Sequence, residues 1–420
     1  MKKTLKRYVP ELVLDYINNS NYKNKEHLYI ICDMLTRIKT YRKTNNYSGY
    51  ADIPVHFFKD IISSRVSYKQ AMDFLQQSGI IDCDGLYSKD GGKALGYKFH
   101  DIFISRIKEV EINKPTLFKK ITDNVNTANN VVDDALKSSK EYFLNSFSID
   151  FTRAEKFIEN LYQKEIREAN TQNQIFDCIN RYNAYYMSIA AIRDNHLFYR
   201  KNKTNGRVDT NLTSLKKELK QFITTPDLYQ LDIVNSQPLF LGFLVKDFKS
   251  NNSTSNTLSL YSYLCGPKFT SEMNKYMTWC RTGQFYENFK NEYNLTTGRT
   301  INRDKVKTMT YTILFSPTDA AYAKQANDIF KSIFPGIFRF INDYKKGQHN
   351  KLAIDLQKLE SSMCIDTIIP LLNAKGIKHY TIHDAWLMDD FDRYQGEQII
   401  REAFYKKYGV EPKIYPTQLT

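Results

Sequence analysis

Two aspartates far apart in the chain are the first residues whose type and position could do chemistry. Asp232 lies near the end of an apolar, strand-like run (228–234), and Asp384 follows a second such run, 377–382. Carboxylates on adjacent, rigid strands can hold two divalent ions roughly 3.5–4 Å apart, and such ions stabilise an attacking hydroxyl and a leaving pyrophosphate. We therefore expect Asp232 and Asp384 to be catalytic ligands of two Mg²⁺ or Mn²⁺ ions. Either aspartate alone would be an ordinary residue at a strand end.

A predicted helix over 303–316 carries the second pattern. Along one of its faces, four residues recur at intervals of four: Arg303, Lys307, Tyr311 and Phe315. The two cations would meet the phosphates of a nucleoside triphosphate, and the two aromatic rings would meet its sugar and base. The alternative is an amphipathic helix whose aromatics belong to the core and whose cations are solvated.

The segment after Asp232 predicts how that aspartate is positioned. Asn235, Ser236 and Gln237 form a polar turn, and an apolar run continues to Val245. Such a run predicts a helix that packs back on the strand. The sequence therefore predicts a strand, a turn and a helix around the first carboxylate.

These stretches resemble, in the same order, three motifs of the family A DNA polymerases and the related single-subunit phage-type RNA polymerases. Arg303-x3-Lys307-x3-Tyr311-x3-Phe315-Ser316 looks like their fingers-helix motif. The run 232–237 resembles their first palm motif, and 382–384 resembles their third. Upstream, 205–208 is similar to a Gly-Arg element that precedes the palm. The resemblance covers about residues 200–420.

The resemblance implies an α+β fold, with an antiparallel sheet and helices forming the palm and fingers of a right-hand polymerase. It also implies a role for each matching residue. Asp232 and Asp384 would be metal ligands, Lys307 would bind the triphosphate and act as general acid, and Arg303 would bind the triphosphate. Tyr311 would stack near the incoming sugar, Phe315 would lie against the template base, and Arg207 and His383 would contact the primer–template.

Four positions depart from the family pattern. The fingers motif ends Phe315-Ser316 instead of Tyr-Gly, and Ala385 follows the third-motif aspartate where Glu or Ser is usual. Gln237 occupies the nucleotide-binding position that is a glutamate in DNA-synthesising members and a glycine in RNA-synthesising members. The choice between dNTP and NTP therefore stays open.

The first half of the chain predicts different modules. Three helices around 27–40, 55–63 and 67–78, followed by two strands, are in the order of a winged helix, so we expect a winged-helix-like DNA-binding domain over 1–113. Its basic candidates are Arg65, Lys69, Lys89 and Lys93. The alternative is a winged helix used only for protein contacts. We expect a helical, thumb-like region over 114–200 and the palm and fingers over 201–420.

Composition bounds the class of protein. The 420 residues carry a formal net charge of +14, which favours a polyanionic partner such as nucleic acid, although a Lys- and Asn-rich composition alone would also produce it. Six scattered cysteines, without a Cys-x-x-Cys pair, indicate a reducing, cytoplasmic setting. Because we identify neither a signal peptide nor a membrane-spanning run, we expect no membrane partner.

Together these patterns predict a template-directed nucleic-acid polymerase that uses a DNA template and primer, with RNA as another template. We favour a DNA polymerase of a phage, plasmid or other mobile element, because Gln237 is bulkier than glycine. A primase or small RNA polymerase that uses NTPs is the first alternative. A replication-initiator or DNA-binding protein with an inactive palm is the second.

Overall fold

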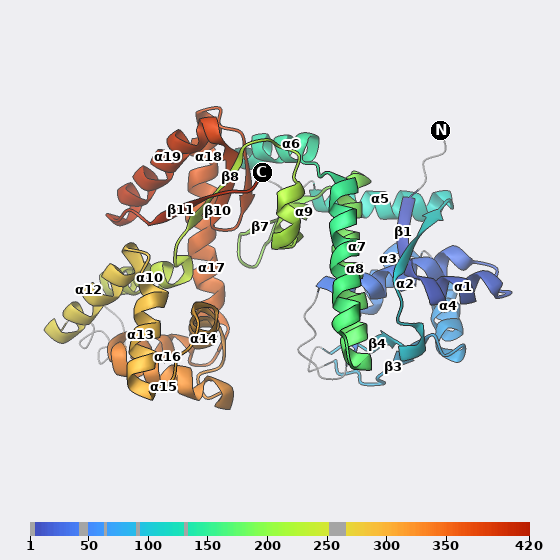
Figure 1. Ribbon diagram of the computed structural model, residues 1–420, viewed down its shortest axis with the longest axis horizontal. Helices are drawn as coiled ribbons and strands as arrows, with labels where there is room; N and C mark the ends of the chain where they lie inside the picture. The colour runs from blue at the N-terminus through green and yellow to red at the C-terminus, as the bar shows by residue number, and fades with distance from the viewer. Residues whose placement is uncertain (1–4, 42–48, 63–64, 90–92, 130–132, 252–265) are drawn as a thin grey trace. The chain divides into compact units, whose positions relative to one another are not determined.

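The computed structural model describes residues 5–41, 49–62, 65–89, 93–129, 133–251 and 266–420 (Figure 1). The chain folds into two compact units that alternate along the sequence. Unit 1 comprises Met1–Val131, Phe147–Tyr199 and Thr210–Thr224, and unit 2 comprises Val132–Ser146, Arg200–Asp209 and Thr225–Thr420. The three consecutive domains expected from the sequence, 1–113, 114–200 and 201–420, stay a prediction.

Unit 1 opens with an antiparallel pair of strands, β1 (Leu5–Pro10) and β5 (Ile107–Ile112). A small antiparallel sheet has the order β2-β4-β3. The elements between β1 and β5 are α1 (Glu11–Asn19), α2 (Lys25–Tyr41), β2 (Ala51–Asp52), α3 (Val55–Ile61), α4 (Arg65–Gln77), β3 (Ile81–Cys83) and β4 (Gly96–Phe99). Among these elements, α2, α3 and α4 followed by β3 and β4 correspond to the predicted order of three helices and two strands. The winged-helix assignment stays an interpretation of that order.

The rest of unit 1 is mainly helical. After α5 (Pro115–Asn129), the long helices α7 (Phe151–Glu168) and α8 (Gln172–Arg193) pack against each other. Asp150 caps α7, because its side chain accepts a hydrogen bond from the Arg153 amide at 3.0 Å.

Short elements occur in both units. They are β6 (Tyr199–Lys201), β7 (Val208–Thr210), α9 (Asn211–Ser214) and the 3₁₀ turns Asp101–Phe103, Asp134–Leu136, Lys217–Phe222 and Ala321–Ala323.

Unit 2 is built on an antiparallel sheet of order β11-β8-β10-β9. Its strands are β8 (Leu228–Ile233), β9 (His379–Ile382), β10 (Ala385–Asp389) and β11 (Ile414–Gln418). Because side chains alternate along a strand, one face buries Leu231 and Trp386, and α19 (Asp390–Tyr408) packs against it. The opposite face carries Asp232 and the 62% exposed Tyr415. This second face is therefore open at β8 and β11.

A helix covers the far end of that open face. Tyr142 of α6 (Lys137–Ser146) stacks on Tyr380 of β9, with ring centroids 5.1 Å apart and planes 18° apart. The open part of the face is thus limited to the strands near Asp232.

The other helices of unit 2 form a second layer, and α17 runs from the sheet to α14–α16 (Figure 1). Close packing requires Gly242 in α10, because a Cβ there would lie 2.2 Å from the sulfur of Met277 in α12. The helices are α10 (Ser236–Asn251), α12 (Pro267–Arg281), α13 (Phe285–Thr297), α14 (Arg303–Phe315), α15 (Lys324–Ile333), α16 (Pro335–Lys345), α17 (Lys351–Met363), the π turn Cys364–Ile368 and α18 (Ile369–Ala374).

Two further expectations concern the described part of the chain. No helix within it is both long and apolar enough to cross a bilayer. Its cysteines, Cys32, Cys83, Cys178, Cys280 and Cys364, are free thiols. Cys265 and residues 90–92, between the two strands predicted for the winged helix, lie outside the described residues.

Candidate active site

Asp232 and Asp384 lie on neighbouring strands of the unit 2 sheet. Asp232 is directly opposite Ala385 in the register of β8 and β10, and Asp384 is the residue before Ala385. The amide of Ile233 also donates to the carbonyl of Asp384 at 3.4 Å. Antiparallel pairing therefore brings together two carboxylates that are far apart in the sequence. Both residues are half-buried.

The backbone is strained on both sides of this pair. His383 and Asp384 form the two-residue loop between β9 and β10, and His383 has a φ of 52°. Asn235, in the turn after β8, has a φ of 59°. Residues with side chains seldom adopt positive φ, and such strain concentrates at functional sites. The half-buried His383, a predicted primer contact, is fixed beside Asp384 by this hairpin.

Negative charge accumulates around Asp384. Burial raises its pKa well above the usual range for an aspartate, and the charges of Glu360 and Asp232 raise it further. A hydrogen bond with Ser236 and the charge of Arg207 act in the opposite direction. The two aspartates thus occupy an environment in which a cation would favour their ionised forms.

We tested whether this donor set fits Mg²⁺. Mg²⁺ prefers oxygen ligands and is often bound by one or two carboxylates together with substrate phosphates. Within the described residues, no group of three or more His, Cys, Asp or Glu side chains is arranged to hold a metal. A site built on Asp232 and Asp384 would therefore supply two carboxylate ligands and leave the other positions around Mg²⁺ to substrate phosphate and water.

Glu360 in α17 is a residue of this site that the sequence interpretation missed. It is only 1% exposed, and it accepts hydrogen bonds from Arg207, Ser236 and Gln237. A signal was present in the sequence, because Glu360 falls on the apolar stripe of its helix. That stripe consists of Leu352, Leu356 and Met363, all fully buried. An acidic residue on a buried stripe needs partners, so it marks a polar site.

Arg207 and Gln237 are brought to Glu360 from two other segments. The guanidinium of Arg207 approaches Glu360 Oε1 through Nε, at 2.9 Å, and through Nη2. The buried Gln237 donates from Nε2 to Oε2 of the same carboxylate. Gly206 allows this approach, because a Cβ there would lie 3.1 Å from Cβ of Ser361. The predicted nucleotide-binding glutamine and the predicted primer-contacting arginine therefore share one buried partner.

The four-residue pattern on α14 forms one continuous face. Arg303 and Lys307 are exposed. Tyr311 and Phe315 are half-buried, and their rings stack with centroids 5.5 Å apart and planes 10° apart. The core side of the helix consists of other residues, namely Val306, Met309, Thr310, Ile313 and Leu314. The two aromatics are therefore not part of that core, which favours the binding interpretation of the helix over the purely amphipathic one.

Electrostatic interactions connect this face to the aspartates. Burial raises the pKa of Tyr311, and the negative charges of Asp384 and Glu360 raise it further. Tyr286 in α13 is hydrogen-bonded to Tyr311, and burial, this interaction and the charge of Asp384 all raise its pKa. The Arg303 guanidinium lies 5.3 Å from the centre of the Tyr286 ring. The structure thus brings the predicted residues of the palm and the helix into one neighbourhood.

Both ends of α14 are anchored. Asn302 caps the N-terminus by accepting from the Lys305 amide at 2.8 Å. At the C-terminus, the buried Lys345 donates from Nζ to the carbonyl oxygens of Ile313 at 2.6 Å and of Ser316 at 2.8 Å. Burial lowers the pKa of Lys345 to about 8. The sequence interpretation missed this lysine, which holds the helix that carries the predicted phosphate contacts.

The basic candidates of unit 1 differ in what they can contact. Lys69 and Lys89 are exposed. Arg65 begins α4, and its side chain lies outside the described residues. Lys93 donates from Nζ to Asp84 at 2.6 Å and lies 3.6 Å from Asp52. Its charge is therefore already balanced within the module.

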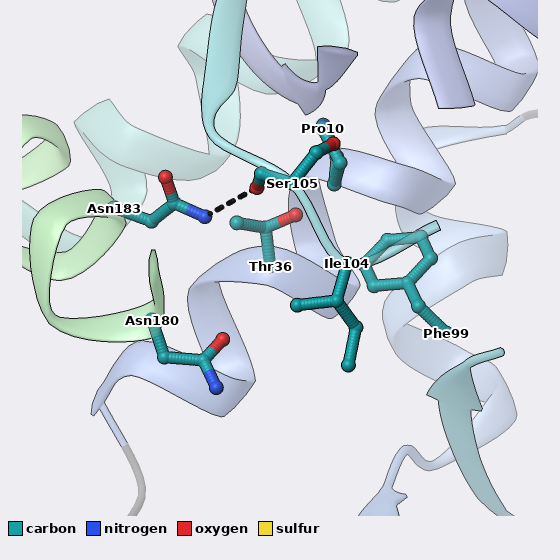
Figure 2. A pocket seen from close by; sticks show the side chains of 7 residues that line it. All are labelled: Pro10, Thr36, Phe99, Ile104, Ser105, Asn180 and Asn183. Carbon is teal, nitrogen blue, oxygen red and sulfur yellow. Dashed lines mark hydrogen bonds between the residues drawn. The ribbon is translucent and has the colours of Figure 1, made fainter. Parts of the chain in front are cut away.

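Unit 1 also contains a small pocket between β4, α2 and α8, shown in Figure 2. Its polar lining includes Thr36, Ser105, Asn180 and Asn183. Both ends of the Asn183 amide serve the fold, because Nδ2 donates to the Ser105 carbonyl at 3.0 Å and Oδ1 accepts from the Ile107 amide at 3.0 Å. Since no ionisable side chain lines this pocket, it is not a candidate catalytic centre.

Comparisons with known proteins place little constraint on this chain. No protein-family model matches it, and no curated protein matches it. Among solved structures, it is similar to the POL domain of Pol1 from M. smegmatis, in complex with DNA primer-template and dNTP. The TM-score is 0.46 at 10% sequence identity, and the match covers 72% of this chain and 72% of the other.

Proposed function

We propose that this chain is a template-directed nucleic-acid polymerase, with DNA synthesis favoured over RNA synthesis. The observation that carries the proposal is the pairing of Asp232 and Asp384 next to the exposed cations and stacked aromatics of α14. Phosphoryl transfer depends mainly on positioning and on electrostatic stabilisation. Paired carboxylates together with a face for phosphates and a base meet both needs.

The residues of α14 and the two aspartates have different roles in the proposed reaction. Arg303 and Lys307 bind the phosphates of the incoming nucleotide, while Tyr311 and Phe315 contact its sugar and the nascent base pair. The primer 3′-hydroxyl gives its proton to water as its oxygen forms a bond to the α-phosphorus; the bond from that phosphorus to pyrophosphate breaks, and Lys307 donates a proton from Nζ to the departing oxygen. Asp232 and Asp384 would hold Mg²⁺ or Mn²⁺, which supplies charge stabilisation at the attacking and departing oxygens.

The surroundings of this pair support binding of a primer end. The sheet face of Asp232 is open near β11, where Tyr415 is 62% exposed. His383 adjoins Asp384 in the β9–β10 loop, and the charge of Arg207 acts on Asp384. Both residues are assigned to the primer–template. A formal net charge of +14 favours attraction of the nucleic-acid backbone.

We also propose that unit 1 contacts duplex DNA through the exposed side of α4. Lys69 and Gln70 are exposed on that helix, and both side-chain types bind phosphates or base edges. Arg65 at the start of the helix is assigned to the same surface. The neutralised Lys93 is left out of this assignment.

One assay tests the proposed function and chooses the nucleotide. The purified chain is incubated with Mg²⁺ or Mn²⁺, a primed or unprimed DNA template, and either dNTPs or NTPs. DNA synthesis from the primer supports the favoured function, whereas products made from NTPs would assign RNA synthesis. Absence of any product, together with retained DNA binding, would contradict the polymerase and favour a DNA-binding protein with an inactive palm.

A further inference from the structure

Glu360 carries a buried negative charge that the fold surrounds with donors from two distant segments. Arg207 approaches Oε1 from the loop after β6. Ser236 donates from Oγ to Oε2 at 2.7 Å, and Gln237 donates to the same oxygen. A buried carboxylate is costly unless it is paired and hydrogen-bonded, so these donors are held firmly in place. The geometry of the three donors therefore depends on one side chain.

Each donor lies next to a residue of the candidate active site. Ser236 and Gln237 open α10, directly after the strained turn that follows Asp232. Ser236 Oγ also lies within hydrogen-bonding reach of Asp384. Its one proton can go to only one of the two carboxylates at a time, so Ser236 lies between Glu360 and Asp384 as a donor that they share. Glu360 thus connects to the aspartate pair through a single side chain.

The position of Arg207 is fixed along α17 as well. Asn205 donates from Nδ2 to Gln357 Oε1 at 3.0 Å, on the same helix as Glu360. Because Nε and Nη2 of Arg207 face Glu360, the remaining Nη1 group is the part of the guanidinium that can meet a nucleic acid. The carboxylate therefore decides the direction in which Arg207 presents its charge.

We propose that Glu360 is a positioning residue, whose buried carboxylate holds Arg207 and the Ser236–Gln237 turn in the one arrangement that serves nucleotidyl transfer. This role rests on the proposed polymerase function. Glu360 acts through its neighbours and needs no contact with nucleotide or primer. It should consequently affect turnover more than binding of the primer–template.

The test compares Glu360→Gln with a matched control. Glu397 of α19 accepts two hydrogen bonds from Arg401, at 3.0 and 2.6 Å, so Glu397→Gln removes a similar arginine–carboxylate pair elsewhere in the same unit. We expect Glu360→Gln to lower kcat at least tenfold while the KM for primer–template changes less than threefold. Glu397→Gln should leave both within twofold. A Glu360→Gln variant with kcat within twofold of the wild type would overturn the proposal.

A double variant separates positioning through Arg207 from an independent effect. If Glu360 acts largely through Arg207, kcat of Arg207→Gln/Glu360→Gln should stay within threefold of the slower single variant. Losses that multiply would contradict this route. Should Glu360→Gln fail to fold, Glu360→Asp keeps the charge but shortens the side chain, and the same criteria apply to it.

Hydrogen exchange tests the role of Glu360 independently of polymerase activity. Absence of synthesis by the wild type would refute the proposed function, whereas hydrogen exchange would still decide the role of Glu360. The amides of Ser236, Gln237 and Leu239 should exchange at least tenfold faster in Glu360→Gln and at the wild-type rate in Glu397→Gln. Unchanged exchange in Glu360→Gln would overturn the positioning role.

Discussion

Asp232 and Ala385 are direct antiparallel partners, and this register sets Asp384 beside Asp232. A shift of one residue would move an aspartate to the opposite face of the sheet, because side chains alternate along strands. The strand register therefore places the negative charge of Asp232 beside Asp384. Substitutions in this pair should change the activity and the stability of the protein in different directions.

Asp384→Asn should abolish synthesis without destabilising the protein. The neighbouring charges of Glu360 and Asp232 raise the pKa of Asp384, so a neutral amide removes unfavourable interactions. We expect a melting temperature equal to or higher than that of the wild type, measured by circular dichroism without divalent ions. A melting temperature several degrees lower would show that the carboxylate stabilises the fold and would contradict this account of the site.

Substitutions along the predicted face of α14 should have different effects on kcat and on KM. Lys307→Ala should lower kcat by about 10²–10³-fold, in the range expected for a lost proton donor. Tyr311→Ala and Phe315→Ala should mainly raise the KM for the nucleotide, since they remove stacked rings. Steady-state kinetics of primer extension measures both effects.

Lys305→Ala is the matched control for Lys307→Ala. Lys305 is exposed on the same helix, and two residues before Lys307 it points to a different side. Its loss should change kcat and KM by no more than twofold. Equal losses in both variants would mean that the general positive charge of α14, and not the predicted face, supports the reaction.

Lys345 predicts an unusual pH dependence of stability. Burial lowers its pKa to about 8, against 10.5 for an ordinary lysine. Between these values the unfolded chain binds a proton that the folded protein has released, so this lysine contributes more stability as the pH rises from about 8 to 10.5. The stability of the wild type relative to Lys345→Met should therefore increase by about 1–2 kcal/mol between pH 7 and 9.5.

Thermal melts of both proteins across this pH range measure the change. Lys346→Met provides the control, because Lys346 is 78% exposed and pairs with Asp343 at the surface. Its difference from the wild type should not vary with pH. A pH-independent difference for Lys345→Met would show that Lys345 keeps an ordinary pKa in the folded protein.

Lys69→Glu should weaken binding of duplex DNA by unit 1. Each lost phosphate contact should also reduce the slope of log Kd against log salt by about 0.9. Lys164→Glu, on the exposed side of α7, has the same change of charge and should have a smaller effect. Fluorescence anisotropy at several salt concentrations gives both values. Equal effects of the two substitutions would favour protein contacts by this module.

The local patterns of the chain predicted its regular elements well. The strand before Asn235, the helix from Arg303 and the strand before His383 appear as β8, α14 and β9. Each depends on a periodicity that a few neighbouring residues determine. The polar turn and the helix after Asp232 follow from the same logic.

Long-range contacts explain what the sequence interpretation missed. Glu360 and Lys345 both lie within helices and are buried against segments that are distant in the chain. A local pattern of neighbouring residues does not reveal these contacts. Arg207 is predicted to contact the primer–template, and its hydrogen bonds to Glu360 within the protein were not predicted. Lys93, a predicted DNA contact, also has a partner in the fold that the sequence pattern does not reveal, because it pairs with Asp84.

The most direct test of the central claim is single-turnover primer extension by the wild type, Asp232→Asn, Asp384→Asn and a control, Asp328→Asn. Asp328 lies on α15 and forms an exposed ion pair with Lys324. With Mg²⁺ or Mn²⁺, we predict extension by the wild type and the control, and rates at least about 10³-fold lower for the other two. Extension at the wild-type rate by either Asp232→Asn or Asp384→Asn would contradict the claim that these carboxylates form the catalytic centre.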